Sequence, residues 1–309
     1  MKKILFALLF VLFFSMALYA EEQQPQQFEG FNLAGYGEGG VKTWDVKGDT
    51  ADIVGNLVKL SNIVANAYGK DKMNLTADYG TVDKQSGTMH LEKDVVVTTD
   101  TGAKLTTDSL DWERSKDLVR TDDPVTITRE GVVATGTGAT GHPNLKDAQL
   151  NKDVTVNMKT EEKDAAGVIT GRVVTITCDG PMEMEYMNSR ATFNDNVVAI
   201  DGERKITADK MEVFFDSGQK KIQEIICTGH VAVLHGENSS YSDKAVYKAA
   251  EGKLVLSGRP KLILYTDDKG GISLDGGVST EKPVAKEDQM EIQVTPPKEA
   301  PAEPMELRK

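Results

Sequence analysis

The stretch Leu75-Thr76-Ala77-Asp78-Tyr79 decides the fold, because it returns 30 residues later as Leu105-Thr106-Thr107-Asp108-Ser109. A weaker version, Thr135-Gly136-Thr137-Gly138-Ala139, follows after one more period. A fixed period of this size is typical of stacked supersecondary units that complete one another's hydrophobic core. The sequence therefore predicts an array with open ends and a long apolar interior.

A second array follows with a period of 34 residues. Asn196-Val197-Val198-Ala199-Ile200 matches His230-Val231-Ala232-Val233-Leu234, and Ala208-Asp209-Lys210 matches Ser242-Asp243-Lys244. Apolar and polar residues alternate within these runs, as in half-buried strands, and Gly, Asn and Asp clusters mark turns between them. We therefore expect an all-β protein built from repeated strand-turn-strand units, coiled or sandwich-like in architecture.

One face of these strands is expected to line an apolar interior. Alternation cannot separate a filled core from a groove that holds an apolar ligand, so both interpretations stay open. The residues expected to line this interior are Val95, Val97, Val125 and Ile127 in the first array, and Phe193, Val198, Ile200, Met211, Val213, Phe215, Val231, Val233 and Leu256 in the second.

The beginning of the chain indicates export. Lys2 and Lys3 precede an apolar run over residues 4–18, and Ala20 stands before an acidic, glutamine-rich segment. This is the layout of a secretory signal peptide, predicted over residues 1–20. An uncleaved membrane anchor is the alternative, because about 17 apolar residues can just span a bilayer. Either reading places the remainder outside the cytoplasm.

Composition divides the rest of the chain into segments. We expect a polar linker over 21–30, a first module over 31–159, a charged linker over 160–167 and a second module over 168–275. Residues 276–309 hold half of the ten prolines among Glu and Lys, which predicts a disordered tail. The alternative reading of that tail is a peptide that docks a partner.

Charge and motifs argue against several function classes. The net charge of −12, which becomes −14 if Lys2 and Lys3 leave with the signal, repels phosphate backbones and argues against nucleic-acid binding. The sequence contains no P-loop and no Gly-x-Ser-x-Gly motif. Cys227 and His230 have the spacing of half a zinc site, without a second half. We therefore expect no enzyme, no cofactor and no metal.

The two cysteines, Cys178 and Cys227, both fall in the second module. Outside the cytoplasm they either form a disulfide or stay as two free, buried thiols. A disulfide here would contribute on the order of 3 kcal/mol to stability. The sequence leaves both alternatives open.

The second module resembles the OstA-like periplasmic LptA proteins of lipopolysaccharide transport. The resemblance rests on Ile176-Thr177-Cys178-Asp179-Gly180-Pro181-Met182, Ala191-Thr192-Phe193-Asn194-Asp195-Asn196-Val197 and Ile206-Thr207-Ala208-Asp209-Lys210-Met211. The first module is similar to LptC, a member of the same superfamily, at Trp44-Asp45-Val46-Lys47-Gly48 and Thr121-Asp122-Asp123-Pro124-Val125. The order and spacing of these runs carry the resemblance more than any one motif.

The resemblance implies two tandem twisted β-jelly rolls, each open at one long side, with lipopolysaccharide acyl chains seated between their sheets. It also implies edge-strand addition to other bridge proteins, from the inner-membrane transporter complex to the outer-membrane translocon. The expected function is therefore that of a passive periplasmic carrier or bridge component. A structural β-solenoid or adhesin without lipid is the main alternative, and a polysaccharide-acting β-helix enzyme is a more remote one.

Overall fold

The computed structural model describes residues 26–69, 71–163, 169–216, 221–264 and 289–293 of the chain. In this part, 18 strands form one antiparallel sheet. The predicted signal peptide lies outside the described residues, as does most of the predicted tail. In the described residues, no helix is both long enough and apolar enough to cross a membrane.

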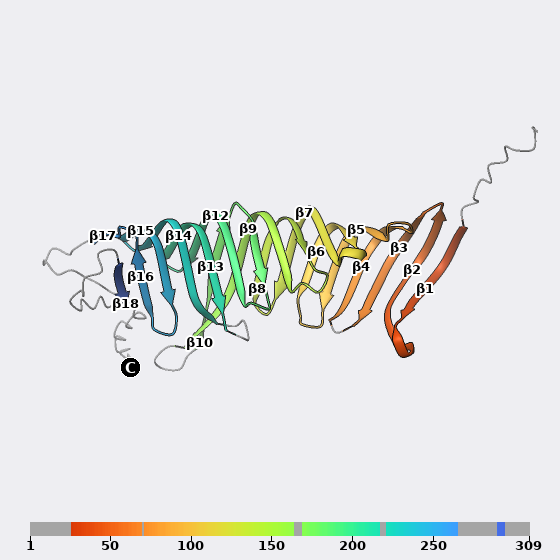
Figure 1. Ribbon diagram of the computed structural model, residues 1–309, viewed down its shortest axis with the longest axis horizontal. Helices are drawn as coiled ribbons and strands as arrows, with labels where there is room; N and C mark the ends of the chain where they lie inside the picture. The colour runs from red at the N-terminus through yellow and green to blue at the C-terminus, as the bar shows by residue number, and fades with distance from the viewer. Residues whose placement is uncertain (1–25, 70, 164–168, 217–220, 265–288, 294–309) are drawn as a thin grey trace, which may run out of the picture.

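The strands follow one another along the long axis of the molecule, from β1 at one end to β16–β18 at the other (Figure 1). Two short 3-10 helices interrupt them, η1 (Glu38–Gly40) and η2 (Arg114–Lys116). The strands are β1 (Gln26–Tyr36), β2 (Lys42–Val54), β3 (Leu57–Tyr68), β4 (Lys72–Asp83), β5 (Thr88–Thr99), β6 (Lys104–Glu113), β7 (Leu118–Arg129), β8 (Val132–Gly141), β9 (Asp147–Lys163), β10 (Ile169–Cys178), β11 (Met182–Glu185), β12 (Arg190–Asp201), β13 (Arg204–Phe215), β14 (Ile222–His235), β15 (Asn238–Lys248), β16 (Lys253–Ser257), β17 (Lys261–Ile263) and β18 (Gln289–Gln293).

Each sequence repeat is one pair of antiparallel strands. The 30-residue period places Leu75 on β4, Leu105 on β6 and Thr135 on β8. The 34-residue period likewise relates β12 to β14 and β13 to β15. One unit cannot bury its apolar face alone, so neighbouring units complete it by stacking. The all-β prediction and the repeated strand-turn-strand unit are confirmed.

Most of the long strands are bent by a β-bulge near their middle. In β5 the register shifts between Glu92 and Val95, where Lys93 and Asp94 have positive φ. Corresponding shifts occur at Asp195-Asn196 in β12 and at Gly229-His230 in β14. A bulge bends its strand and increases the local twist. The sheet therefore curls over, and side chains on both sides of each bend reach one interior.

Aspartates contact the side chains of residues that have positive φ at these bends and elsewhere, namely His230, Asn196 and Asn62. Asp209 Oδ2 lies 2.8 Å from His230 Nδ1. Asn196 Nδ2 donates to Asp179 Oδ2 at 2.7 Å, and Asn62 Nδ2 donates to Asp49 Oδ2 at 2.6 Å. Asp and Asn are also among the residues that best tolerate left-handed backbone. Part of the acidic character of the chain thus has a structural use at the bends.

Three predicted segment boundaries are wrong. Residues 26–30, assigned to a linker, belong to β1, and Thr160–Lys163 continue β9 and pair with residues 169–172 of β10. Gln289–Gln293, assigned to a disordered tail, form β18 and pair with β16. Charged composition misled these assignments, because ladder hydrogen bonds use backbone groups that charged residues carry as well. The sheet therefore continues across the predicted junction between modules.

Asp45, on the buried side of β2, is held by three neighbours. Asn66 Nδ2 donates to it at 2.8 Å, the Tyr68 hydroxyl donates at 2.9 Å, and Lys42 pairs with it. The hydrogen bonds from Asn66, Lys42 and Tyr68 lower the pKa of Asp45 from 3.8 to about 2. These contacts join β2 to β3 near the N-terminal end of the array.

We expect the Asp45→Asn variant to be less stable than the original protein at neutral pH. A carboxyl whose pKa is lower in the folded state adds stability above its unfolded pKa of 3.8, and that stability is lost as the pH falls towards 2. The urea midpoints of the two proteins should therefore converge over this acidic range. A difference between them that stays constant down to the lowest pH would contradict the assignment.

Candidate functional site

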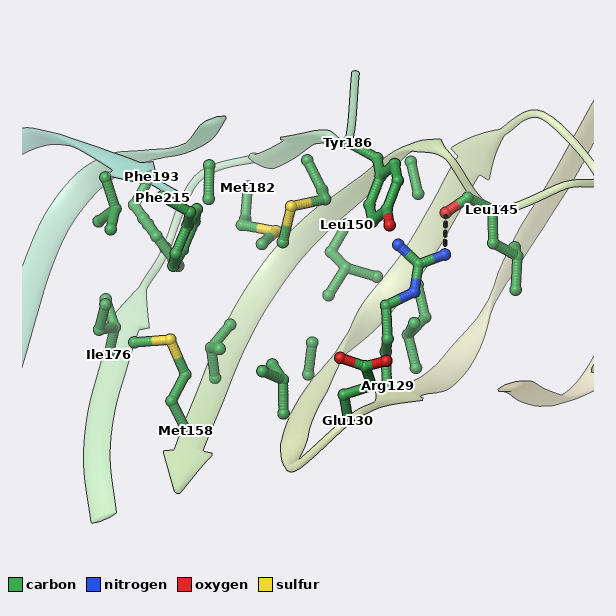
Figure 2. Close-up of a pocket in the computed structure, with 18 of the residues that line it drawn as sticks. Arg129, Glu130, Leu145, Leu150, Met158, Ile176, Met182, Tyr186, Phe193 and Phe215 are labelled. Carbon is green, nitrogen blue, oxygen red and sulfur yellow. Dashed lines mark hydrogen bonds between the residues drawn. The ribbon is translucent and has the colours of Figure 1, made fainter. Parts of the chain in front are cut away.

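A cavity of about 170 Å³ lies inside the roll, midway along its length. Its walls are mostly Met, Leu, Ile, Val, Ala and Phe side chains from strands β7 to β13 (Figure 2). Leu150 precedes the bend of β9 and Val156 follows it, yet both line the cavity. The two halves of the curled sheet therefore face each other across this space.

An interruption between β10 and β11 accompanies the cavity. Both of these strands pair with β9 and with β12, so together they occupy the place of one strand. Residues 179–181 separate them, and Pro181 carries no backbone donor for the ladder. Small side chains at Ala134, Ala148 and Ala191 leave space in the neighbouring walls.

Methionines give the wall room to adapt. Met158, Met182 and Met184 line the cavity from β9 and β11. Methionine is unbranched and polarisable, so it fills irregular gaps and repacks readily around a ligand. The site is an apolar, deformable space without chemically reactive groups on most of its wall.

The only polar side chains among the described lining residues of the cavity are Thr101, Arg129, Glu130 and Tyr186. Glu130 is exposed to solvent, so we call this end of the cavity its mouth. Arg129 Nη2 donates to Thr101 Oγ1 at 3.2 Å and to the Leu145 carbonyl at 3.3 Å. Its guanidinium carbon lies 4.5 Å from the centre of the Tyr186 ring (Figure 2). Burial lowers the pKa of Arg129, and the electrostatic interactions with Tyr186 and Glu130 only partly oppose this shift.

The size of the cavity limits what it holds in this conformation. An engineered apolar cavity of roughly 150 Å³ takes up one benzene molecule. The present volume of about 170 Å³ therefore fits a short segment of one hydrocarbon chain. A lipid with several chains would require the two halves of the sheet to move apart.

The cavity coincides with a junction between two family matches. A model of the family described as lipopolysaccharide-assembly, LptC-related, matches residues 4–159. A model described as LptA/(LptD N-terminal domain) LPS transport protein matches residues 175–278. The chain belongs to the LptC-related family. A search of the curated proteins found no match.

Membership of the LptC-related family confirms the resemblance inferred from sequence and shows that the protein takes part in lipopolysaccharide transport. It also indicates an envelope location. The cavity lies across the junction, since Arg129 and Leu150 fall within the LptC-related match and Phe193 and Val213 within the LptA match. This LptC-related chain therefore joins two family segments through one continuous interior.

Eleven of the predicted lining residues do point inward. Ile127, Phe193, Val213 and Phe215 line the cavity, and Val233 is partly buried against the core. The others are buried in the core elsewhere along the interior: Val95, Val97, Val125, Met211, Val231 and Leu256. Whether these residues contact lipid remains a prediction.

Val198 and Ile200 are corrections to the predicted lining. Val198 is not part of the core, and the Ile200 side chain is 44% exposed. The cross-strand neighbours of Ile200 are Thr175 and Lys205, which belong to the outer face. The inward positions of β12 after its bulge are Val197, which is fully buried, and Ala199.

Cys178 and Cys227 are free and buried, so the structure lacks the disulfide that was one of two sequence-based alternatives. Cys178 Sγ contacts the Gly180 carbonyl at 3.4 Å. Burial raises the pKa of Cys178 to about 11 and that of Cys227 to about 12. Both groups are therefore neutral thiols near neutral pH, and the thiolate is the reactive form.

We expect both cysteines to react only when the protein unfolds. A thiol titration of native, unreduced protein should show little reaction, because the thiols are buried and protonated. The same titration in denaturant should return two thiols per chain, one each from Cys178 and Cys227. A denatured sample with no free thiol would show that the two residues are bonded.

Proposed function

We propose that the protein shields lipopolysaccharide acyl chains between the two halves of its curled sheet during transport from the inner to the outer membrane. The observation that carries this proposal is the apolar interior, which runs through both family segments and contains a cavity where they meet. Burying one methylene is worth about 0.8 kcal/mol, so an acyl chain strongly favours such a space over water.

The proposed role needs no chemical step. The cavity wall is apolar except at its mouth, and the sequence contains no nucleotide-binding motif. The energy for movement would come from another component of the transport system. We therefore propose passive conduction, in which chains exchange water for apolar contacts along the interior.

Uptake of a hydrocarbon probe by the purified protein tests this proposal. N-phenyl-1-naphthylamine should bind saturably with increased fluorescence, and lipopolysaccharide should displace it without any nucleotide. Probe that adsorbs nonspecifically to exposed apolar patches would not give fluorescence that saturates with probe concentration. If neither the probe nor lipopolysaccharide binds, a filled core with a structural role becomes the better account.

We further propose that the protein joins other bridge components through its edge strands. At the N-terminal end, β1 has a registered backbone pairing only with β2 in the described part of the chain. This strand exposes Phe28, Leu33 and Tyr36. An edge with unpaired backbone groups and exposed apolar side chains is suited to strand addition by a partner.

The other end differs, because the chain covers its own edge there. All five residues of β18 pair with β16, from Gln289 opposite Ser257 to Gln293 opposite Lys253. A partner that adds a strand to β16 would have to displace β18, which forms the edge itself but, with five residues, offers few backbone groups for docking. The two ends of the array therefore differ in how open they are to docking.

Removing residues 289–309 is expected to promote end-to-end association. The freed edge of β16 and the open edge of β1 would then form a heterologous contact, which extends into filaments when it does not close into a ring. Light scattering should detect oligomers that grow with protein concentration. Truncation of residues 294–309 alone keeps β18 and is the matched control; identical behaviour of the two truncations would contradict the prediction.

A further inference from the structure

We propose that Arg129 and Tyr186 form a binding site for the anionic group of an amphiphile whose hydrocarbon chain enters the cavity between the two family segments. This inference rests on the proposed function of the interior, because it names the polar contact made by a chain that lodges there. The ligand class is a phosphate monoester or a carboxylate attached to an unbranched alkyl chain.

The hydrogen bonding of Arg129 leaves capacity for a ligand. Both of its protein hydrogen bonds use Nη2, and both acceptors are neutral oxygens. Its Nε atom is buried and has no hydrogen-bond partner among the described residues. A guanidinium group has five N–H donors in a fixed fork; with Nη2 engaged and Nε buried, the two N–H groups of Nη1 remain for an acceptor at the mouth.

The other partly buried arginines near the junction are bound differently. Arg190 pairs with Glu185 at 2.5 Å, and Arg172 Nε lies 2.7 Å from Asp201 Oδ1. Those two charges pair directly with carboxylates of the protein itself, whereas the direct contacts of Arg129 are to neutral oxygens and an aromatic ring, and the Glu130 carboxylate acts on it only through its charge. A desolvated cation gains most from an anion placed directly against it.

The position of Arg129 matches the shape of an amphiphile. The residue ends β7 at the mouth, and its guanidinium lies between the Tyr186 ring and the Leu145 carbonyl, while the lining residues Met158, Ile176 and Phe193 lie on the opposite side of the view (Figure 2). An acyl or alkyl chain in the cavity would place its polar end beside this group. The planar guanidinium fork fits the paired oxygens of phosphate or carboxylate.

Two features shape the strength and selectivity of this site. Glu130 lies at the same mouth, and its negative charge opposes an incoming anion. The net charge of the chain, −12, also gives no long-range attraction for anions. Recognition would therefore depend on short-range contact with Arg129 after the chain has entered, so a free anion without a chain should bind weakly.

Competition against the fluorescent hydrocarbon probe tests the inference with decyl phosphate, decanoate, decanol and inorganic phosphate. We expect decyl phosphate to bind about tenfold more tightly than decanol, since a charge-assisted hydrogen bond has about this effect. Decanoate should show a smaller preference, and inorganic phosphate should not displace the probe. Arg129→Met should remove the preference and leave decanol binding unchanged.

Two further variants complete the test. Arg120→Met changes an exposed arginine on the same strand, β7, and should leave the preference intact. Glu130→Gln should tighten decyl phosphate binding severalfold and leave decanol binding unchanged, which tests the site even if Arg129→Met fails to fold. Equal binding of decyl phosphate and decanol, or a preference that survives in Arg129→Met, would overturn the inference. Failure of both amphiphiles to bind would instead overturn the proposed function.

Discussion

Replacing Ala134 with phenylalanine is expected to abolish uptake of the hydrocarbon probe while the protein remains folded. Ala134 is buried on β8 and lines the cavity of about 170 Å³, which a phenyl ring would largely occupy. Filling a cavity commonly adds about 0.5–2 kcal/mol of stability, whereas overpacking costs about 1–3 kcal/mol. The measurement is probe fluorescence together with a thermal melt.

The control for this prediction is the adjacent residue on the opposite face. Val133 is 37% exposed, and its cross-strand neighbours are Thr128 and Asn157. Val133→Phe adds similar bulk outside the interior and should leave probe uptake unchanged. If Ala134→Phe binds the probe as well as Val133→Phe does, the binding takes place elsewhere and the assignment of the cavity fails.

Replacing Phe193 with alanine is expected to lower the free energy of unfolding by about 3–5 kcal/mol, the usual loss for truncating a buried aromatic side chain. Phe193 is 2% exposed and stands opposite Met182 and Met211 on the neighbouring strands. It supports the core and also forms part of the cavity wall. Urea denaturation of the two proteins measures the difference.

Ile200→Ala provides the comparison within the same strand. Its side chain lies on the outer face of β12, where substitutions usually change stability by about 0.5 kcal/mol or less. A similar loss for Ile200→Ala and Phe193→Ala would mean that the inward and outward faces of β12 have been misassigned.

Much of the fold could be predicted from the sequence, because it is repetitive and local. Each period is one strand pair, and each strand pairs mainly with its neighbours in the chain, as β4 does with β3 and β5. Such local pairing leaves a clear trace in periodicity and turn residues. The family resemblance added the jelly-roll architecture, which the structure and the family matches support.

The predicted lining failed where it departed from the repeat alignment. The repeat aligns Val197 with Val231 and Ala199 with Val233, whereas the predicted Val198 and Ile200 align with Ala232 and Leu234. Val197 and Ala199 are the ones that face inward. Phe193, Val197 and Ala199 are separated by even numbers of residues along β12. This spacing could have identified Val197 and Ala199 as inward-facing before the structure was known.

The polar part of the site could not be predicted in the same way. Arg129 ends one strand and Tyr186 lies in a turn 57 positions later, so nothing local in the sequence links them. Only the pairing of β11 with β9 and β12 brings that turn to the mouth of the cavity. The segment boundaries failed for a related reason, because strand pairing across the junction is a non-local property.

Photocrosslinking in cells from the interior positions Val213 and Val97, with Ile200 as the outward control, tests the central claim most directly. Val213 and Val97 are buried in the LptA-matched and LptC-matched segments, and Ile200 is exposed. Shielding of acyl chains along the whole interior predicts lipopolysaccharide adducts at Val213 and at Val97, and none at Ile200. No adduct at either interior position, or equal adducts at all three, would contradict it.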